Sequence, residues 1–155
     1  MLKACIYLVW LATMVAFPAV AATLVVTVDG VEDRMSVDSL RAIRTNTLVT
    51  ETPWTEAEDS YEGIYLADLL THLDVGSEQG VLVLTALNDY RVEAPLADLV
   101  VADAFLSFSR NGELMPVRHY GPYWLLFPFT QRPELNDRTH RVWAVWQLKA
   151  LDISR

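Results

Sequence analysis

Apolar runs of strand length, each closed by a turn-forming residue, recur along this 155-residue chain. The run Val81–Leu87 has the length of a buried strand and is interrupted by Asn88-Asp89. Asn111-Gly112 joins two further apolar runs, and this pair favours a β-hairpin because both turn positions need positive φ. Helical periodicity is clearest over residues 65–73, where leucines recur three or four residues apart. The pattern predicts a β-dominated α+β fold in a single domain.

The remaining elements are short and follow the same logic. Ser36 is the expected N-cap of a helix, and Pro95 is expected to begin another helical turn. We expect further strands at Leu24–Val28, Asn46–Thr50, Tyr90–Ala94 and Arg141–Ile153. In the last of these the apolar phase shifts, which predicts a bulge near Lys149 or Ala150.

The first residues have the layout of a secretory signal peptide. Lys3 is followed by an almost wholly apolar run to Phe17 and then by small residues spaced as at a cleavage site. The run is short for a membrane span, although an uncleaved anchor stays open. We therefore expect residues 1–22 to be a signal peptide, residues 23–155 to be the domain, and the mature protein to be periplasmic.

Loss of this segment would change the chemistry that the chain can offer. Cys5 is the only cysteine, so the rest of the chain has no disulfide, thiolate metal ligand or cysteine nucleophile. Without Lys3, 11 basic residues face 20 acidic ones, a net charge of −9. This acidity argues against nucleic acid or anionic membranes as partners. It fits either simple solubility or a basic partner surface.

Three polar and aromatic stretches lie at strand ends, where binding groups often sit on a rigid sheet. They are residues 50–57 with Trp54, residues 87–91, and residues 115–129 with Arg118. Each also has a purely structural interpretation, since Trp54 can cap the core, residues 88–89 can form a turn, and Arg118 can pair with a surface carboxylate. The sequence has no Gly-rich phosphate loop and no histidine pair with metal-ligand spacing.

The order of these stretches resembles the molybdopterin-binding domain of sulfite-oxidase-like oxidoreductases. The similar segments are "TPW" leading to "YEGIYLADLL", "ALNDYRVEAPLADL", "SRNGELMPVRHYGPYWLLFP" and "VWQLKALDI". The block from Asn111 to Pro128 is the most specific of them. The resemblance covers nearly the whole chain after the signal segment and implies that family's β-dominated fold, with Tyr90 in the place of an active-site tyrosine.

Two departures bear on function. In the family, a cysteine in the loop before the "GIYLADLL" helix supplies the thiolate that binds molybdenum, whereas the corresponding loop here, Thr50–Thr55, has none. Threonine cannot replace a soft anionic ligand. Trp124 stands near the position of the family's phosphate-binding basic residue. We therefore expect no molybdenum and no catalytic residues.

What the resemblance leaves is a pocket for a reduced pterin, such as a tetrahydropterin. Trp54, Tyr90 or Trp124 can stack on its ring, and Asp89 or Glu51 can accept hydrogen bonds from its guanidine-like edge. Arg118 and His119 can bind its carbonyl or hydroxyl tail. The expected ligand-binding residues are Thr50, Glu51, Trp54, Asn88, Asp89, Tyr90, Arg118, His119, Gly121 and Trp124.

Three functional hypotheses follow. The resemblance of short, cysteine-free, exported members implies a non-catalytic regulator that carries a pterin to the periplasmic sensory domain of a membrane-bound cyclic-di-GMP enzyme. The second hypothesis is a molybdopterin-dependent oxidoreductase subunit that uses other ligands. The third is an interaction domain with a vestigial pocket. The identity of the pterin, the sign of regulation and the oligomeric state stay open.

Overall fold

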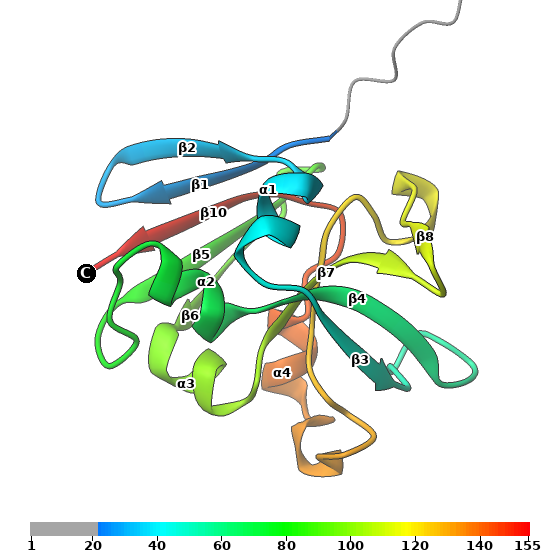
Figure 1. The fold of residues 1–155 in the computed structure, drawn as a ribbon. Coiled ribbons are helices and arrows are strands. Elements are labelled where there is room, and N and C mark those ends of the chain that lie inside the picture. The colour runs from blue at the N-terminus through cyan, green and yellow to red at the C-terminus, as the bar shows by residue number, and fades with distance from the viewer. Residues whose placement is uncertain (1–21) are drawn as a thin grey trace, which may run out of the picture.

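The computed structural model describes residues 22–155, so the predicted signal peptide lies almost wholly outside the described residues. Two sheets form the body of this part of the chain (Figure 1). The first sheet has the strand order β2-β1-β10-β5-β6, and the second has the order β3-β4-β7-β8 with β9 also paired to β7. The predicted β-dominated α+β fold is confirmed.

The elements follow one another closely along the chain. The strands are β1 (Leu24–Val28), β2 (Val31–Met35), β3 (Asn46–Thr50), β4 (Asp59–Tyr65), β5 (Val81–Ala86), β6 (Arg91–Pro95), β7 (Phe105–Arg110), β8 (Glu113–Leu114), β9 (Trp124–Leu126) and β10 (Leu148–Ser154). The helices are α1 (Val37–Ile43), α2 (Leu66–His72), α3 (Leu96–Val101) and α4 (Arg138–Trp143), with 3₁₀ turns η1 (Val117–His119) and η2 (Pro133–Leu135).

Strand β10 is the centre of the first sheet. It pairs in parallel with β1 and antiparallel with β5. The register with β5 shifts between Leu148 and Ala150, which confirms the bulge predicted there. Just before β10 the chain also bonds to the second sheet, where the Leu125 N–H of β9 donates to the Val145 carbonyl at 3.0 Å.

The core is built from the inner faces of both sheets and the helices that cover them. Leu66, Leu69 and Leu70 of α2 are buried, as the helical spacing of leucines predicts. Strand β9 is buried at every residue, so its apolar sequence reflects coverage on both faces. Within residues 22–155, no helix is long and apolar enough to cross a membrane.

Several local predictions are confirmed. The Ser36 side chain accepts the Ser39 backbone N–H as the N-cap of α1. Pro95 precedes α3, and Asn111 and Gly112 both have positive φ in the β7–β8 hairpin. These signals depend only on neighbouring residues, so sequence alone can show them.

One prediction about elements is wrong, and two strands were not predicted. The strand expected from Arg141 is instead α4 followed by β10, with an Asp137 cap that accepts the His140 N–H. Strand β2 was missed because it is a charged edge strand, exposed at its first four residues. Strand β4 was not predicted either, although β3 and β7 pair with it on both sides.

Candidate functional site

Four aromatic side chains from distant parts of the chain meet where the two sheets approach each other. Tyr120 stacks on Trp124 with ring centroids 4.3 Å apart and an angle of 24°. Trp54 meets the edge of Trp146 at 5.2 Å, and Tyr120 lies 5.8 Å from the same ring. Such offset and edge-on contacts are favourable for aromatic rings and hold each ring in one orientation.

Backbone hydrogen bonds fix the position of this cluster. The Gln147 N–H donates to the Tyr120 carbonyl at 2.9 Å, and the Gln147 side-chain amide donates to the Val117 carbonyl at 2.8 Å. Both Tyr120 and Gln147 have positive φ, 69° and 52° respectively. The segments that carry Tyr120 and Trp146 are therefore joined through one residue.

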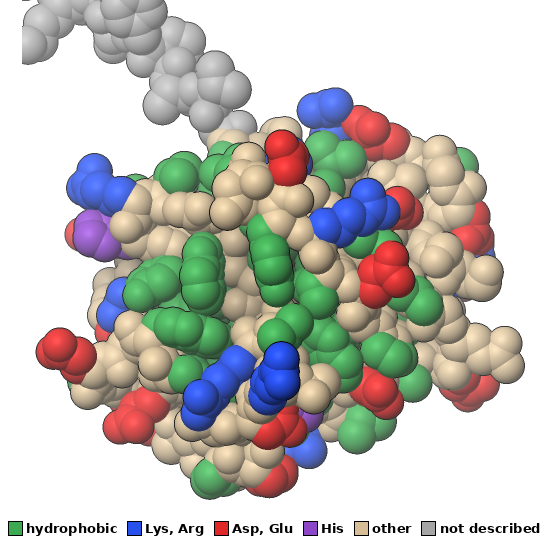
Figure 2. Space-filling model, turned by 180° about the vertical axis from the view of Figure 1, so that it is seen from behind, with side chains coloured by type: hydrophobic (Ala, Val, Ile, Leu, Met, Phe, Trp, Pro, Cys, Tyr) green, Lys and Arg blue, Asp and Glu red, His purple; other side chains and the backbone are tan. Residues whose placement is uncertain are grey.

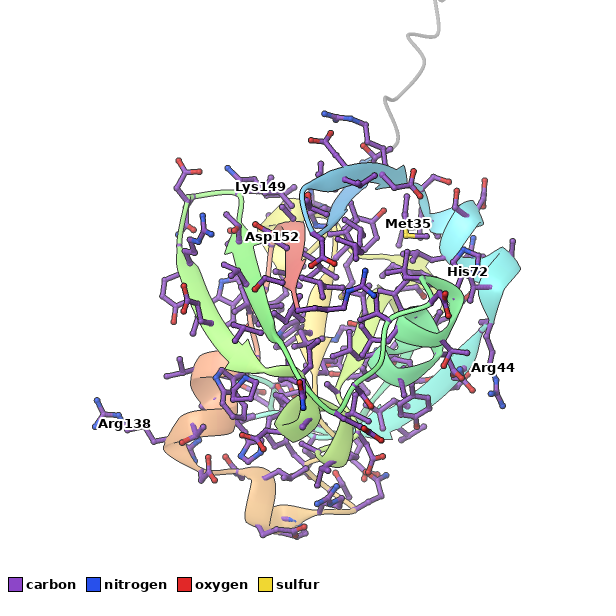
Figure 3. The ribbon with its side chains drawn as sticks, turned by 90° about the vertical axis from the view of Figure 1, so that its left-hand side faces the viewer. Met35, Arg44, His72, Arg138, Lys149 and Asp152 are labelled. Carbon is purple, nitrogen blue, oxygen red and sulfur yellow. The ribbon has the colours of Figure 1, made fainter. Side chains whose placement is uncertain are left out.

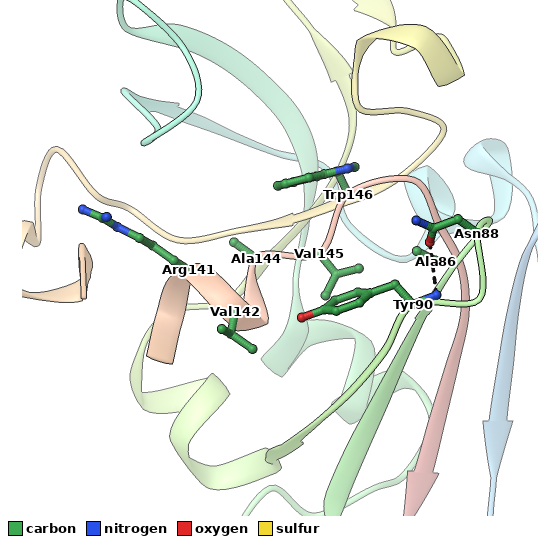
Figure 4. A pocket seen from close by; sticks show the side chains of 8 residues that line it. All are labelled: Ala86, Asn88, Tyr90, Arg141, Val142, Ala144, Val145 and Trp146. Carbon is green, nitrogen blue, oxygen red and sulfur yellow. Dashed lines mark hydrogen bonds between the residues drawn. The ribbon is translucent and has the colours of Figure 1, made fainter. Parts of the chain in front are cut away.

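A cavity of about 250 Å³ opens beside the cluster. Its lining comes from the end of β5, the turn after it, α4 and the segment before β10: Ala86, Asn88, Tyr90, Arg141, Val142, Ala144, Val145 and Trp146. Figure 4 shows the rings of Trp146 and Tyr90 on opposite sides, with Val145 between them. Tyr90 is 47% exposed and Trp146 is 37% exposed, so both rings are accessible from solvent.

Polar groups stand at the two ends of this apolar cavity. Asn88 lies at one end and Arg141 at the other in Figure 4. The Asn88 side-chain oxygen accepts the Tyr90 N–H at 3.1 Å, which leaves its amide N–H groups free to donate to another molecule. Arg141 Nε donates to the Asn136 side-chain oxygen at 2.7 Å, and its terminal nitrogens make no ion pair within residues 22–155.

Exposed apolar side chains also occur on the surface. Figure 2 shows hydrophobic side chains gathered at the centre of one face, with charged side chains of both signs around them. Among the exposed large apolar residues, Tyr90, Val142 and Trp146 line the cavity, and Leu87 lies between the lining residues Ala86 and Asn88 in the sequence. Arg138, one turn before Arg141 on α4, points away from the body (Figure 3).

Of the residues expected to bind a ligand, Asn88 and Tyr90 line the cavity. Trp54 is partly buried and packs against Trp146 instead of lining the cavity. Trp124 is fully buried beneath Tyr120 and donates from its indole N–H to the Ala144 carbonyl at 3.2 Å. The geometry thus makes Trp124 a support for the cavity segment 144–146, because its ring has no exposed face for a ligand.

Thr50 and Glu51 lie at a different place, at the end of β3. Thr50 is fully buried, donates to the Glu51 carbonyl at 2.8 Å and accepts the Thr130 N–H at 3.0 Å. The Glu51 N–H donates to the Thr130 hydroxyl at 2.8 Å, while the Glu51 carboxylate is exposed. The Thr50 hydroxyl is therefore already engaged in tying β3 to the segment after β9.

Asp89 and Gly121 each make a structural contact outside the aromatic cavity. The Asp89 carboxylate pairs with the Lys149 ammonium, and this hydrogen bond lowers the pKa of Asp89 below its ordinary value. Gly121 is buried directly against Met115, because a Cβ at Gly121 would lie 1.8 Å from the Met115 carbonyl oxygen. Neither residue lines the aromatic cavity.

Arg118 and His119 line a second hollow of about 450 Å³, formed by η1 and the β7–β8 hairpin. Their side chains make no hydrogen bond or ion pair within the part of the chain that the structure describes. Residues 115–129 therefore contribute to two separate places instead of one pocket wall. His119 borders the second hollow, whereas its neighbour Tyr120 packs against Trp146 of the first.

Trp146, Arg141 and Val142 are cavity residues that sequence reasoning missed. All three were assigned to a continuous final strand, in which alternate residues point to opposite faces. The helix α4 and the left-handed Gln147 instead bring them to one side. The Asp137 cap of α4 was the available signal, since Asp followed by a helix-compatible stretch marks a helix start.

The residues present do not fit a molybdenum ion held by a protein thiolate. No cysteine occurs among residues 22–155, and Thr50 in the corresponding loop is buried and fully hydrogen-bonded. This part of the chain also contains no cluster of three or more His, Cys, Asp or Glu side chains that could hold a metal. A flat aromatic group fits better, because the cavity offers ring faces and hydrogen-bonding ends.

Comparisons with known proteins connect this geometry to a family. Residues 9–131 match the oxidoreductase molybdopterin binding domain. An uncharacterized oxidoreductase, YuiH of Bacillus subtilis (strain 168), is 26% identical over 77 residues, which are 50% of this chain and 39% of that protein. The crystal structure of the sulfane dehydrogenase SoxCD from Paracoccus pantotrophus matches 86% of this chain and 38% of its own, with 17% identity and a TM-score of 0.58.

The matches bear on the fold and on the functional hypotheses to different extents. The likeness to SoxCD shows the fold, and this chain spans about two fifths of the length of either protein. For function, the matches agree better with the oxidoreductase alternative than with a regulator, since they are to oxidoreductase domains. The periplasmic location, the partner and the ligand residues stay predictions. The chain belongs to the oxidoreductase molybdopterin-binding domain family.

Proposed function

We propose that this chain binds a pterin in the aromatic cavity and does not itself ligate molybdenum. The observation that carries the proposal is the pair of accessible rings, Tyr90 and Trp146, on a cavity with polar groups at both ends. A pterin is flat and aromatic, with hydrogen-bonding groups along its edges. Aromatic walls with a few polar groups are what binding sites for such small molecules use.

Each lining group has a part in this proposal. Tyr90 and Trp146 provide the apolar surface against which the ring stacks. The Asn88 amide N–H groups donate to a ring carbonyl or nitrogen, because its oxygen is already occupied by the Tyr90 N–H. The terminal nitrogens of Arg141 donate to the substituent at the other end. The side chains of Val142 and Val145 exclude water from the bound pterin ring.

The finer proposal is a periplasmic regulatory role. The signal-like N-terminus supports export, and the absent thiolate supports binding without redox chemistry at a metal. In this role the protein would present its reduced pterin to the periplasmic sensory domain of a membrane-bound cyclic-di-GMP enzyme. The support for that partner is the resemblance in sequence to short, cysteine-free members of the family.

The experiment is to identify what co-purifies with the protein from its own export pathway. Mass spectrometry of the released small molecule is combined with elemental analysis of the same sample. We expect a pterin without stoichiometric molybdenum. A sample with no pterin, and no quenching of tryptophan fluorescence when tetrahydropterin is added, would refute the proposed ligand.

A second candidate function is a molybdopterin-dependent oxidoreductase domain. The match of residues 9–131 to the family favours it, as does the similarity to YuiH. The metal would then depend on ligands other than a protein thiolate of residues 22–155. Stoichiometric molybdenum in the elemental analysis, together with a molybdopterin in the mass spectrum, would establish this candidate and overturn the metal-free proposal.

A further inference from the structure

The hollow beside the β7–β8 hairpin has a chemistry different from that of the aromatic cavity. Its basic side chains are Arg110, Arg118 and His119, with Glu113 as the acidic lining residue. Arg110 is held from below by Asp59, with 2.5 Å between the two side chains, and its buried Nε has no hydrogen-bond partner within residues 22–155. The hollow is thus lined by one ion-paired guanidinium, that of Arg110, and by Arg118 and His119.

This basic hollow stands out against the charge of the whole chain. Residues 22–155 contain 11 basic and 20 acidic residues, and seven of the basic side chains form ion pairs there. Arg118 is exposed and has no such pair in spite of the excess of carboxylates. A cation without a partner in an acidic protein is a point to which a negatively charged group is attracted.

Apolar surface adjoins these cations. Leu114 is 57% exposed and Val117 is 50% exposed, one on each side of the buried Met115. Leu114 belongs to β8, which ends the strand order of the second sheet. An edge strand offers unpaired backbone groups to an extended segment from another chain. Cations, exposed apolar side chains and a strand edge therefore lie together on this part of the surface.

We propose that this hollow is a docking surface for an acidic, extended segment of a partner protein. Carboxylates of that segment pair with Arg118 and Arg110, and its apolar side chains cover Leu114 and Val117. Charge complementarity selects this occupant, because a neutral segment leaves Arg118 unpaired and a basic segment is repelled by the arginines. The proposal goes beyond pterin binding and does not depend on it.

The hollow is nevertheless next to the proposed ligand site. His119 lines the hollow, and Tyr120, the next residue, packs 5.8 Å from Trp146 of the aromatic cavity. Gln147, the residue after Trp146, donates from its side-chain amide to the Val117 carbonyl of η1. A partner seated here would contact the segment that supports the ligand-facing tryptophan.

The test is a selection from a random displayed peptide library on the purified protein, followed by binding measurements with the enriched peptides. We expect enriched sequences with Asp and Glu around apolar residues, and fluorescence anisotropy should show affinity falling roughly tenfold or more in Arg118→Glu. Arg138→Glu is the matched control, since Arg138 is also an exposed arginine that makes no ion pair among residues 22–155, but it points outward from α4. Its affinity for the peptides should match that of the unmodified protein.

Other occupants give different results, and each of them overturns the proposal. Peptides without acidic enrichment, or equal losses in both variants, would mean that the hollow does not select carboxylates. Binding of anionic phosphatidylglycerol vesicles that Arg118→Glu abolishes, without peptide binding, would identify a lipid surface. Self-association lost in Arg118→Glu would identify a second copy of the chain. Tyr90→Ala should leave peptide binding intact, so failure of the pterin site is recognised separately.

Discussion

Burial divides the aromatic residues around the cavity into two groups. Tyr61 and Trp124 are fully buried and meet edge-on at 5.9 Å, so they support the segments above them. Tyr90 and Trp146 keep more than a third of their surface exposed. Only the second group can change its contacts when a ligand arrives, and the effects of substitution should follow the same division.

Replacing Tyr90 or Trp146 by alanine should weaken pterin binding by roughly tenfold or more, because stacking on one ring contributes about 1–3 kcal/mol. Tyr90→Phe keeps the ring and should retain most of the affinity. Isothermal titration calorimetry with tetrahydropterin measures both. Val31→Ala, at an exposed position on β2, is the control with unchanged affinity. Equal binding by Tyr90→Ala and the unmodified protein would exclude this cavity as the pterin site.

Two buried tyrosines should respond differently to loss of their hydroxyl groups. The Tyr61 hydroxyl has no hydrogen-bond partner within residues 22–155, whereas the Tyr123 hydroxyl donates to the Ala22 carbonyl at 2.8 Å. Tyr61→Phe should leave the free energy of unfolding at neutral pH unchanged or raise it by up to about 1 kcal/mol. Tyr123→Phe should lower it by about 1 kcal/mol. Urea unfolding of both variants makes the comparison.

The same residues should make stability depend on pH in the alkaline range. Burial raises the pKa of Tyr61 to about 12 and that of Tyr123 to about 12. The folded state favours the neutral form of these two hydroxyl groups. Their contribution to the free energy of unfolding is therefore complete below the ordinary tyrosine pKa and is lost as pH rises toward about 12. Tyr61→Phe should therefore lose less stability than the unmodified protein between neutral pH and roughly pH 11. An identical loss in both would contradict the burial effect.

The sequence identified part of the cavity lining and missed the rest for a physical reason. Asn88 and Tyr90 follow an apolar strand directly, so local pattern sufficed to place them at a sheet end. Trp124 and Trp146 both lie in apolar stretches, and pattern alone does not tell which ring the rest of the chain covers. That choice is made by tertiary contacts, here the stacking of Tyr120 on Trp124.

At the scale of elements, the segment between β8 and β9 is fixed by close backbone contact. The Gly121 N–H donates to the Pro116 carbonyl at 3.0 Å, and the Met115 backbone occupies the space where a side chain at Gly121 would begin. The segment carries η1, which lines the basic hollow, and Tyr120, which packs on the aromatic cluster. A change at Gly121 should therefore affect both sites together.

Gly121→Ala should destabilise the fold by about 3 kcal/mol, because the new Cβ cannot fit without a backbone shift. Gly76→Ala is the control, since nothing lies within 4 Å of its Cβ position and its φ is not positive. Its effect should stay within about 0.5 kcal/mol. Thermal unfolding followed by circular dichroism compares the two. Similar melting temperatures would show that the segment moves aside easily.

Most elements followed from local signals, and the exceptions share one cause. The hairpin turn, the helix caps and the bulge in β10 were readable because neighbouring residues determine them. Strand β2 carries charges and β4 contains Gly63 beside a register shift with β7, so neither shows a clean alternating pattern. These strands exist because their partners pair with them, and that information lies far away in the chain.

At the scale of the whole molecule, charge is distributed unevenly over an acidic domain. Most basic side chains neutralise nearby carboxylates, as Arg41 does with Glu62 and Arg44 with Asp68. Arg118 and Arg141 form no ion pair within residues 22–155, and they line the basic hollow and the aromatic cavity respectively. The long-range field of such a protein repels anions generally, so the exposed arginines give these two places their selectivity.

Dependence on molybdenum separates the two candidate functions of the whole protein. If the pterin is held only by the cavity residues, growth with tungstate and without molybdate should leave the amount of co-purified pterin unchanged, because no ligand in residues 22–155 requires the metal. Quantitative mass spectrometry of the released pterin, normalised to protein, measures this. SoxCD is purified in parallel from its own host as the comparison protein, because its structure has a similar fold. Loss of the pterin when molybdate is withheld would mean that the bound species is a molybdenum cofactor, and the oxidoreductase candidate would then replace the binding protein.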